Sequence, residues 1–101
     1  MSRQVRGDLP SGVKINETGL KILALVDRHT KGRSGGVPLS LERMGASVGV
    51  SETTARRNCR VLEQQGLLVV SQRYRSDGGR LENEYAVTDK GRAVLAGVKR
   101  M

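Results

Sequence analysis

The chain has 101 residues, a length that suits one domain with a single small core. It carries 18 Lys and Arg against 10 Asp and Glu, and a domain with a net charge of +8 usually meets a polyanion. Arginine dominates these cations, and its planar fork of donors fits phosphate oxygens and guanine edges. A GC-rich genome would also raise the share of arginine, but it would not explain the net charge.

Several classes of function are disfavoured by what the sequence lacks. No apolar run reaches the roughly 18 residues of a membrane span, and residues 1–10 lack the apolar stretch of a signal peptide. We therefore expect a cytoplasmic protein with no membrane contact. One cysteine, Cys59, and one histidine, His29, give neither a disulfide framework nor a metal cluster. The Gly-rich segment 31–36 lacks the Gly-Lys-Ser/Thr ending of a phosphate-binding loop, so we expect no cofactor, no metal and no enzymatic activity.

The first half of the chain predicts an arm, two helices and a short strand. Residues 1–13 are polar and predict a disordered basic arm, which could enter a minor groove or stay in solvent; residues 14–101 predict one domain. Asn16 caps a helix that runs to His29, with Glu17 in its first turn. A loop over 31–36 and a short edge strand over 37–39 follow. Ser40 caps the next helix, from Leu41 to about Ser47.

The second half predicts a third helix, a hairpin and a closing helix. Gly49-Val50 makes a tight turn, and Ser51 caps a helix that runs to about Gln65, with Gly66 as its left-handed terminator. Strands over 67–75 and 81–87 flank the turn sequence Ser76-Asp77-Gly78-Gly79. Thr88 caps a last helix over 89–98. The predicted fold class is thus α+β, mainly helical.

The stretch from Ser40 to Val87 resembles the bacterial winged helix-turn-helix family, as in MarR and PadR regulators. The shared pattern is a small residue at Gly45, the turn Gly49-Val50-Ser51, Thr54, the helix end Leu62-Glu63-Gln64-Gln65-Gly66-Leu67, and the basic hairpin over 74–80. The closing Thr88-Asp89-Lys90-Gly91 also matches such regulators, in which a helix follows the hairpin, or wing. The resemblance implies a bacterial or phage protein that binds double-stranded DNA and regulates transcription, as a repressor rather than an activator. Two alternatives stay open: a DNA-binding module of plasmid or phage replication, and a winged helix used for protein–protein assembly.

The third helix carries the first candidate site. A helical wheel places Ala55, Cys59 and Leu62 on one side and the arginines on the other side or its flank, as expected for a helix lying in the major groove. The DNA-binding residues predicted here are Ser51, Thr53, Arg56, Arg57 and Arg60. A solvated basic face would show the same spacing. Glu52 either serves the helix dipole or accepts a hydrogen bond from a cytosine amino group, and Cys59 is expected to be a small core residue.

The hairpin and the terminal helices carry two more predictions. Arg73, Arg75 and Arg80 are predicted to contact phosphates or the minor groove; the alternative is a charged edge that blocks aggregation. One winged domain reads few base pairs, so a homodimer on a palindrome is expected. The first and last helices carry more apolar side chains than one small core needs, and the dimer interface is predicted on Ile22, Leu25, Val94, Leu95 and Val98. The alternative is that these two helices only cover each other.

Overall fold

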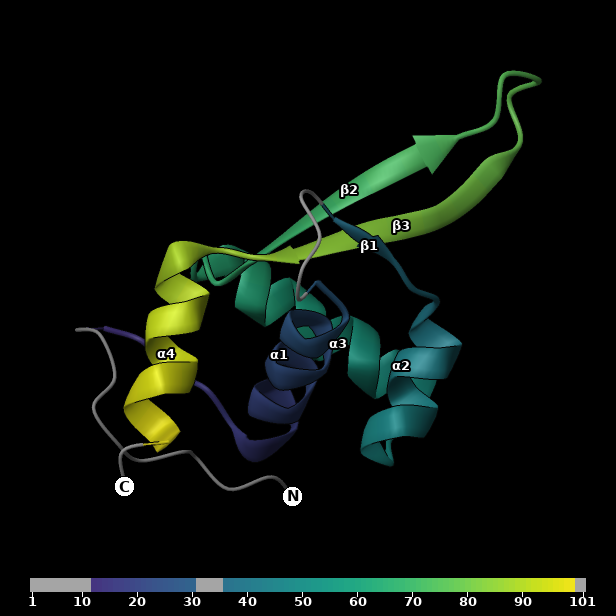
Figure 1. The fold of residues 1–101 in the computed structure, drawn as a ribbon. Helices are drawn as coiled ribbons and strands as arrows, with labels where there is room; N and C mark the ends of the chain where they lie inside the picture. The colour runs from purple at the N-terminus through teal and green to yellow at the C-terminus, as the bar shows by residue number, and fades with distance from the viewer. Residues whose placement is uncertain (1–11, 31–35, 100–101) are drawn as a thin grey trace.

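The computed structural model describes residues 12–30 and 36–99. Along the chain these residues form α1 (Glu17–Thr30), β1 (Val37–Pro38), α2 (Leu41–Val48), α3 (Glu52–Gln64), β2 (Leu68–Tyr74), β3 (Arg80–Val87) and α4 (Asp89–Lys99). The order is the predicted one, and the boundaries differ from the predicted ones by one or two residues (Figure 1). Residues 1–11 of the predicted arm and residues 31–35 of the predicted loop lie outside the described part of the chain.

The four predicted helix caps are confirmed by hydrogen bonds. In each case a short polar side chain accepts from a backbone N–H three residues later, which satisfies a donor that the first turn leaves free. The bonds are Gly19 N to Asn16 Oδ1 at 2.7 Å, Arg43 N to Ser40 Oγ at 3.1 Å, Thr54 N to Ser51 Oγ at 3.1 Å and Gly91 N to Thr88 Oγ1 at 3.0 Å.

The strands form an antiparallel sheet in the order β1-β3-β2. The short strand β1 lies at an edge, where Pro38 removes no ladder hydrogen bond. Tyr85 stands opposite both Val37 and Val70 in the register, and Val87 stands opposite Leu68. Opposed residues share a face of the sheet. These apolar side chains therefore present one face of the sheet to the helices.

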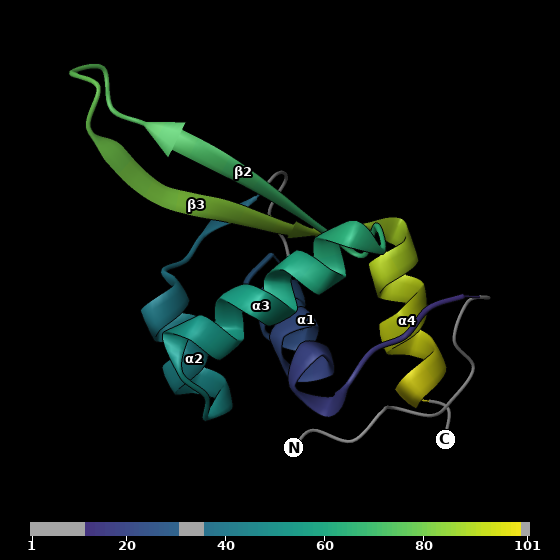
Figure 2. The same ribbon diagram turned by 180° about the vertical axis from the view of Figure 1, so that it is seen from behind.

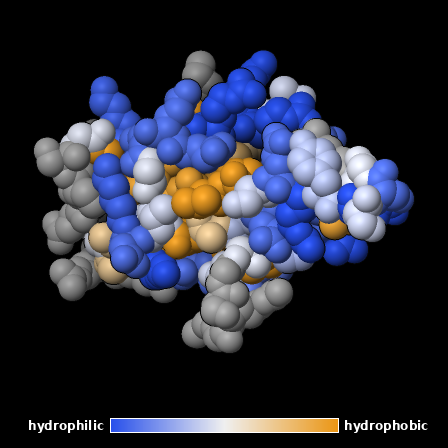
Figure 3. Space-filling model, turned by 90° about the horizontal axis from the view of Figure 1, so that it is seen from above, coloured by the Kyte–Doolittle hydropathy of each residue, from blue (hydrophilic) through white to orange (hydrophobic). Residues whose placement is uncertain are grey.

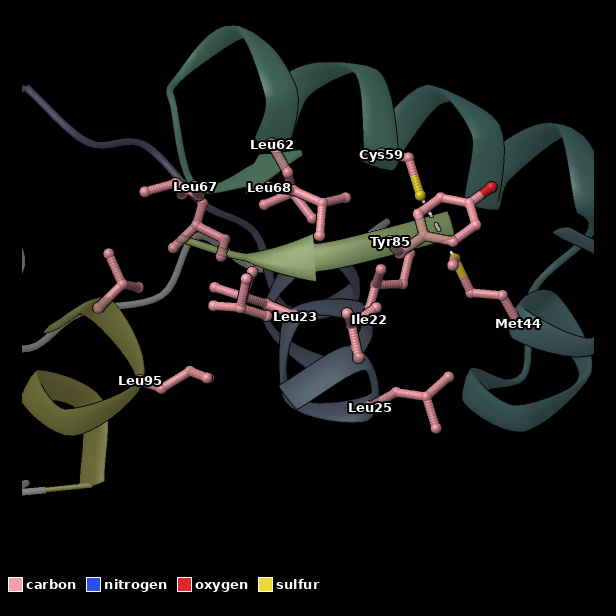
Figure 4. Packing of buried hydrophobic residues seen from close by; sticks show 14 of the residues in the cluster. Ile22, Leu23, Leu25, Met44, Cys59, Leu62, Leu67, Leu68, Tyr85 and Leu95 are labelled. Carbon is pink, nitrogen blue, oxygen red and sulfur yellow. Dashed lines mark hydrogen bonds between the residues drawn. The ribbon is translucent and has the colours of Figure 1, made fainter. Parts of the chain in front are cut away.

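The core lies between this face and the helices. α1 is central, since Ile22, Leu23 and Val26 are completely buried against the other elements. Figure 4 shows Met44 of α2 and Cys59 of α3 meeting beside the ring of Tyr85, with the thiol of Cys59 donating to Met44 Sδ at 3.3 Å. Almost the whole core is aliphatic, as the scarcity of aromatic residues in the sequence required.

Two predictions are corrected by the placement of core residues. Val13, assigned to the disordered arm, is only 8% exposed and belongs to the core, so the packed domain includes this residue. Ile22, Leu25, Val94 and Leu95, predicted to form a dimer interface, are buried within a single chain, and Val98 is partly exposed. α1 contacts α2, α3, α4, β1 and β3, and this explains why it is apolar on so many sides.

None of the described helices is both long enough and apolar enough to cross a membrane.

Candidate nucleic-acid interface

The connection between α2 and α3 holds the two helices at close range. Gly45 of α2 faces this connection, and a Cβ atom there would lie 2.6 Å from the carbonyl oxygen of Val50 and 3.1 Å from that of Ser51. Only glycine avoids a collision with this backbone. The N–H of Val50 donates to the Gly45 carbonyl at 2.8 Å, and Gly49 adopts a left-handed φ of 79° that turns the chain. Gly45 therefore has a packing role, which explains why a small residue stands at this position.

Helix α3, which begins directly after this connection, is amphipathic. Ala55, Cys59 and Leu62 are its buried residues. Arg57 and Arg60 are exposed, and the helical periodicity places them on the side opposite this buried stripe, together with Thr53 and Gln64. Neither guanidinium has an ion pair or hydrogen bond to another described residue. Both groups are therefore available to a ligand.

Arg56 lies on the flank of α3 that faces the hairpin, and it is partly engaged. Its Nη2 contacts Glu52 Oε1 at 3.2 Å in an i,i+4 ion pair, and both side chains are 53% exposed. An exposed pair of this kind contributes roughly 0.3–0.5 kcal/mol, which is little enough for a ligand to displace it. The three predicted arginines thus share α3, but Arg56 differs from the other two in having a carboxylate partner.

A groove of about 590 Å³ separates this flank of α3 from the hairpin. Arg56, Arg60, Glu52 and Glu63 line it from the helix, and Gln72 and Glu82 line it from the strands. Seen from behind, α3 crosses the molecule while the β2–β3 hairpin extends beyond the helical body (Figure 2). The two elements enclose an angle rather than packing along their whole lengths, so they form a concave surface.

Two arginines of the hairpin form ion pairs that the sequence did not indicate. Arg73 Nε lies 3.4 Å from Glu84 Oε1 on the neighbouring strand, and Arg75 Nε lies 3.5 Å from Asp77 Oδ1 in the turn. Both pairs are substantially exposed to solvent, which weakens them. Arg80 opens β3 at the position opposite Tyr74, and its side chain lies outside the described part of the structure.

Two features of this surface were missed by sequence reasoning. Tyr74 is 60% exposed near the hairpin tip, where its hydroxyl donates to Gln72 Oε1 at 2.9 Å. Gln65, directly after α3, exchanges two hydrogen bonds of 2.6 Å with the backbone of Lys14 and so ties the start of the domain to the end of α3. The exposure of Tyr74 could be inferred from its place beside the turn. No signal in the sequence connects Gln65 to Lys14.

Cys59 is the core residue that the sequence predicted. Burial, together with the nearby carboxylate of Glu63, raises the pKa of its thiol to about 12. The thiol is therefore protonated near neutral pH and is a poor nucleophile, because only the thiolate reacts readily. Burial likewise raises the pKa of Tyr85. Neither group offers acid–base or nucleophilic chemistry to the groove.

The surface formed by α3 and the hairpin has the polar, arginine-bearing character that suits contact with a polyanion. Figure 3, a view from above, shows hydrophilic side chains around a limited apolar strip, and the large hydrophobic side chains exposed in the described chain are Val61, Val69 and Tyr74. Arginine on an exposed helix can donate to phosphates and to base edges in a groove about 12 Å wide. Among the described residues, no group of three or more His, Cys, Asp or Glu could hold a metal ion.

Solved structures of transcription regulators resemble this one. The Mycobacterium tuberculosis transcriptional regulator MosR is 28% identical with a TM-score of 0.61, over 81% of this chain and 51% of that one. MosR in complex with DNA is 24% identical with a TM-score of 0.60, over 85% and 54%. A MarR-family transcriptional regulator from Silicibacter pomeroyi is 20% identical with a TM-score of 0.57, over 81% and 48%. The chain thus spans about half the length of these regulators.

No protein-family model matches the sequence, and no curated protein matches it either. The resemblance therefore comes from the structure, through the order of helices and strands and the hairpin between α3 and α4. The described part of the chain has the winged helix-turn-helix fold of MarR-family transcription regulators.

Proposed function

We propose that this protein binds double-stranded DNA sequence-specifically, with α3 in the major groove and the hairpin against neighbouring phosphates or the minor groove. One observation carries the proposal: Arg56, Arg57 and Arg60 are exposed on a helix that directly follows a glycine-packed turn. In helix-turn-helix proteins the second helix reads base edges from its N-terminal part. Ser51 and Thr53 lie at that end of α3 and complete the proposed contact surface.

The biological role that we propose is regulation of transcription rather than catalysis. The solved structures that it resembles are transcription regulators, and one of them is in complex with DNA. Occupancy of a promoter is enough to exclude the polymerase, whereas activation needs a further productive contact. Repression is therefore the simpler outcome of the proposed binding mode.

Selection from a pool of random duplexes tests the proposal. The wild-type protein should enrich one sequence motif at physiological salt, and the R56A/R57A/R60A variant should enrich none while remaining folded by far-UV circular dichroism. The triple variant R28A/R43A/R92A loses the same charge from exposed positions of α1, α2 and α4 and is the matched control. Equal enrichment by the wild-type protein and the α3 variant would refute the proposed reading surface.

We also propose that two copies act together on one palindromic site. A single winged domain contacts few base pairs, and a two-fold dimer doubles the sequence that is read, with half-sites about one helical turn apart. Because Ile22, Leu25, Val94 and Leu95 are core residues, the contact between copies must use other surfaces. Analytical ultracentrifugation should find two chains per palindromic duplex, and one chain per duplex at saturating protein would contradict this part of the proposal.

A further inference from the structure

The first residue of α3 carries a negative charge at the place where the proposed function brings DNA closest. The side chain of Glu52 is 53% exposed and lines the groove between α3 and the hairpin, beside Arg56 and Arg60. Side chains of a helix tilt toward its N-terminus, so the Glu52 carboxylate projects from the leading end of α3. A carboxylate there repels every phosphate that approaches, and this charge lowers the affinity for DNA in general.

The structural contribution of a charge at this position is small. The ion pair with Arg56 and the attraction to the helix N-terminus are both weak when exposed to solvent. The same chain contains the same arrangement elsewhere: Glu17 is the first residue of α1 and pairs with Lys21 at 3.9 Å, with both side chains 56% exposed. Glu17 therefore separates the structural contribution of such a pair from any effect on DNA reading.

The chemistry of the major groove gives the carboxylate a partner. An ionised carboxylate only accepts hydrogen bonds, and the N4 amino group of cytosine is a donor on the major-groove edge. The N6 amino group of adenine is also a donor, but the N7 acceptor beside it would face the carboxylate lone pairs. Arg56, held at 3.2 Å by Glu52, keeps further N–H donors for the O6 and N7 acceptors of guanine.

We propose that Glu52 is a specificity-determining residue, which accepts a hydrogen bond from the N4 amino group of cytosine while Arg56 donates to guanine in the same or the adjoining base pair. The inference rests on the proposed function and deepens it. At a cytosine the carboxylate gains a donor, and at other bases its repulsion of the DNA goes uncompensated. Glu52 thus lowers affinity for most sequences and sharpens the choice of the right one.

The test uses the duplex that the wild-type protein selects. Affinities are measured by fluorescence anisotropy for that duplex, for duplexes with each base pair replaced in turn, and for an unrelated duplex. The wild-type protein should lose about tenfold or more at one cytosine position. The E52Q variant should lose that discrimination, prefer adenine there because an amide fits the N6 and N7 pattern of adenine, and bind the unrelated duplex several-fold more tightly.

The E17Q variant is the matched control, since it removes a first-residue carboxylate and an i,i+4 pair from α1. It should keep the wild-type preference at every position. If E52Q retains the wild-type preference at every position, or loses it only at a position without cytosine, the assignment of Glu52 is wrong while the proposed function stands. If the wild-type protein selects no sequence at all, the proposed function itself fails.

Discussion

Arg57 and Arg60 differ from the arginines of the hairpin in one respect that matters for binding. They face away from the buried stripe of α3 and have no described partner, so they give up no ion pair when a ligand arrives. The hairpin arginines Arg73 and Arg75 must share or break their contacts with Glu84 and Asp77. We therefore expect the arginines of α3 to make the largest individual contributions to the affinity for DNA.

Replacing Arg57 or Arg60 with Ala should weaken binding of the selected duplex by about 1–3 kcal/mol and relax the preference at one base position, if the side chain reads a base. Titrations of duplexes with single base changes measure both effects. Arg28 is an exposed control that lines a separate groove between α1, α2 and α4. If R57A and R60A change affinity no more than R28A does, neither residue reads DNA.

Cys59 gives a pH-dependent prediction. Its thiol has a pKa of about 12 in the folded chain against 9.0 for the free group, so the unfolded chain loses this proton first as the pH rises. The contribution of this thiol to the free energy of unfolding is complete below pH 9. It should fall between pH 9 and 12, by up to about 1.4 kcal/mol per pH unit for one proton. The free energy of unfolding of the wild-type protein should decline more steeply in this range than that of C59A. Parallel curves would show that Cys59 is not the group responsible.

At the scale of elements, the hairpin is expected to bind phosphates without reading sequence. Substituting Arg73, Arg75 or Arg80 with Ala should weaken binding to all duplexes alike. Each substitution that frees one phosphate should also lower the slope of log K against log salt by about one unit. Arg92 on α4 supplies the control substitution. Salt slopes that stay at the wild-type value in all three hairpin variants would rule out a phosphate clamp.

Helix α2 tolerates no side chain at Gly45, where it lies closest to the backbone of the turn that leads to α3. G45A should destabilise the fold by about 1–3 kcal/mol, because the added Cβ meets the backbone carbonyl of Val50 and that collision outweighs the gain in helix propensity. S47A, an exposed change in the same helix, should stay within about 0.5 kcal/mol of the wild-type value. Urea unfolding measures both. Equal stability of G45A and S47A would mean that α2 does not approach the backbone of Val50 and Ser51 this closely.

Short-range features of these elements could be predicted from sequence, because their causes lie within a few residues. The caps at Asn16, Ser40, Ser51 and Thr88 and the constraint at Gly45 depend on local backbone geometry. The ion pair between Arg73 and Glu84 could not be predicted. It depends on strand register, which shifts between Ser71 and Arg73.

At the scale of the whole molecule, the failed prediction concerned how many elements surround α1. The sequence shows a nearly unbroken apolar stretch from Leu20 to Val26, interrupted by Lys21, but it does not show how many elements cover this stretch. Tertiary packing places α2, α3, α4 and the sheet around this helix. The apolar side chains that suggested a dimer interface are therefore buried within one chain. The exposed arginines of α3 were foreseen because exposure on a short helix follows directly from its periodicity.

The central claim is that α3 and the hairpin are the surface that binds DNA. Backbone amide chemical shifts of the isotope-labelled protein, followed by NMR during titration with the selected duplex, test it most directly. We expect the shifts to concentrate in residues 51–64 and 72–80 and α4 to be little affected. Saturable binding with shifts concentrated on α4 and on the face of α1 beside it, and none in α3, would contradict the claim.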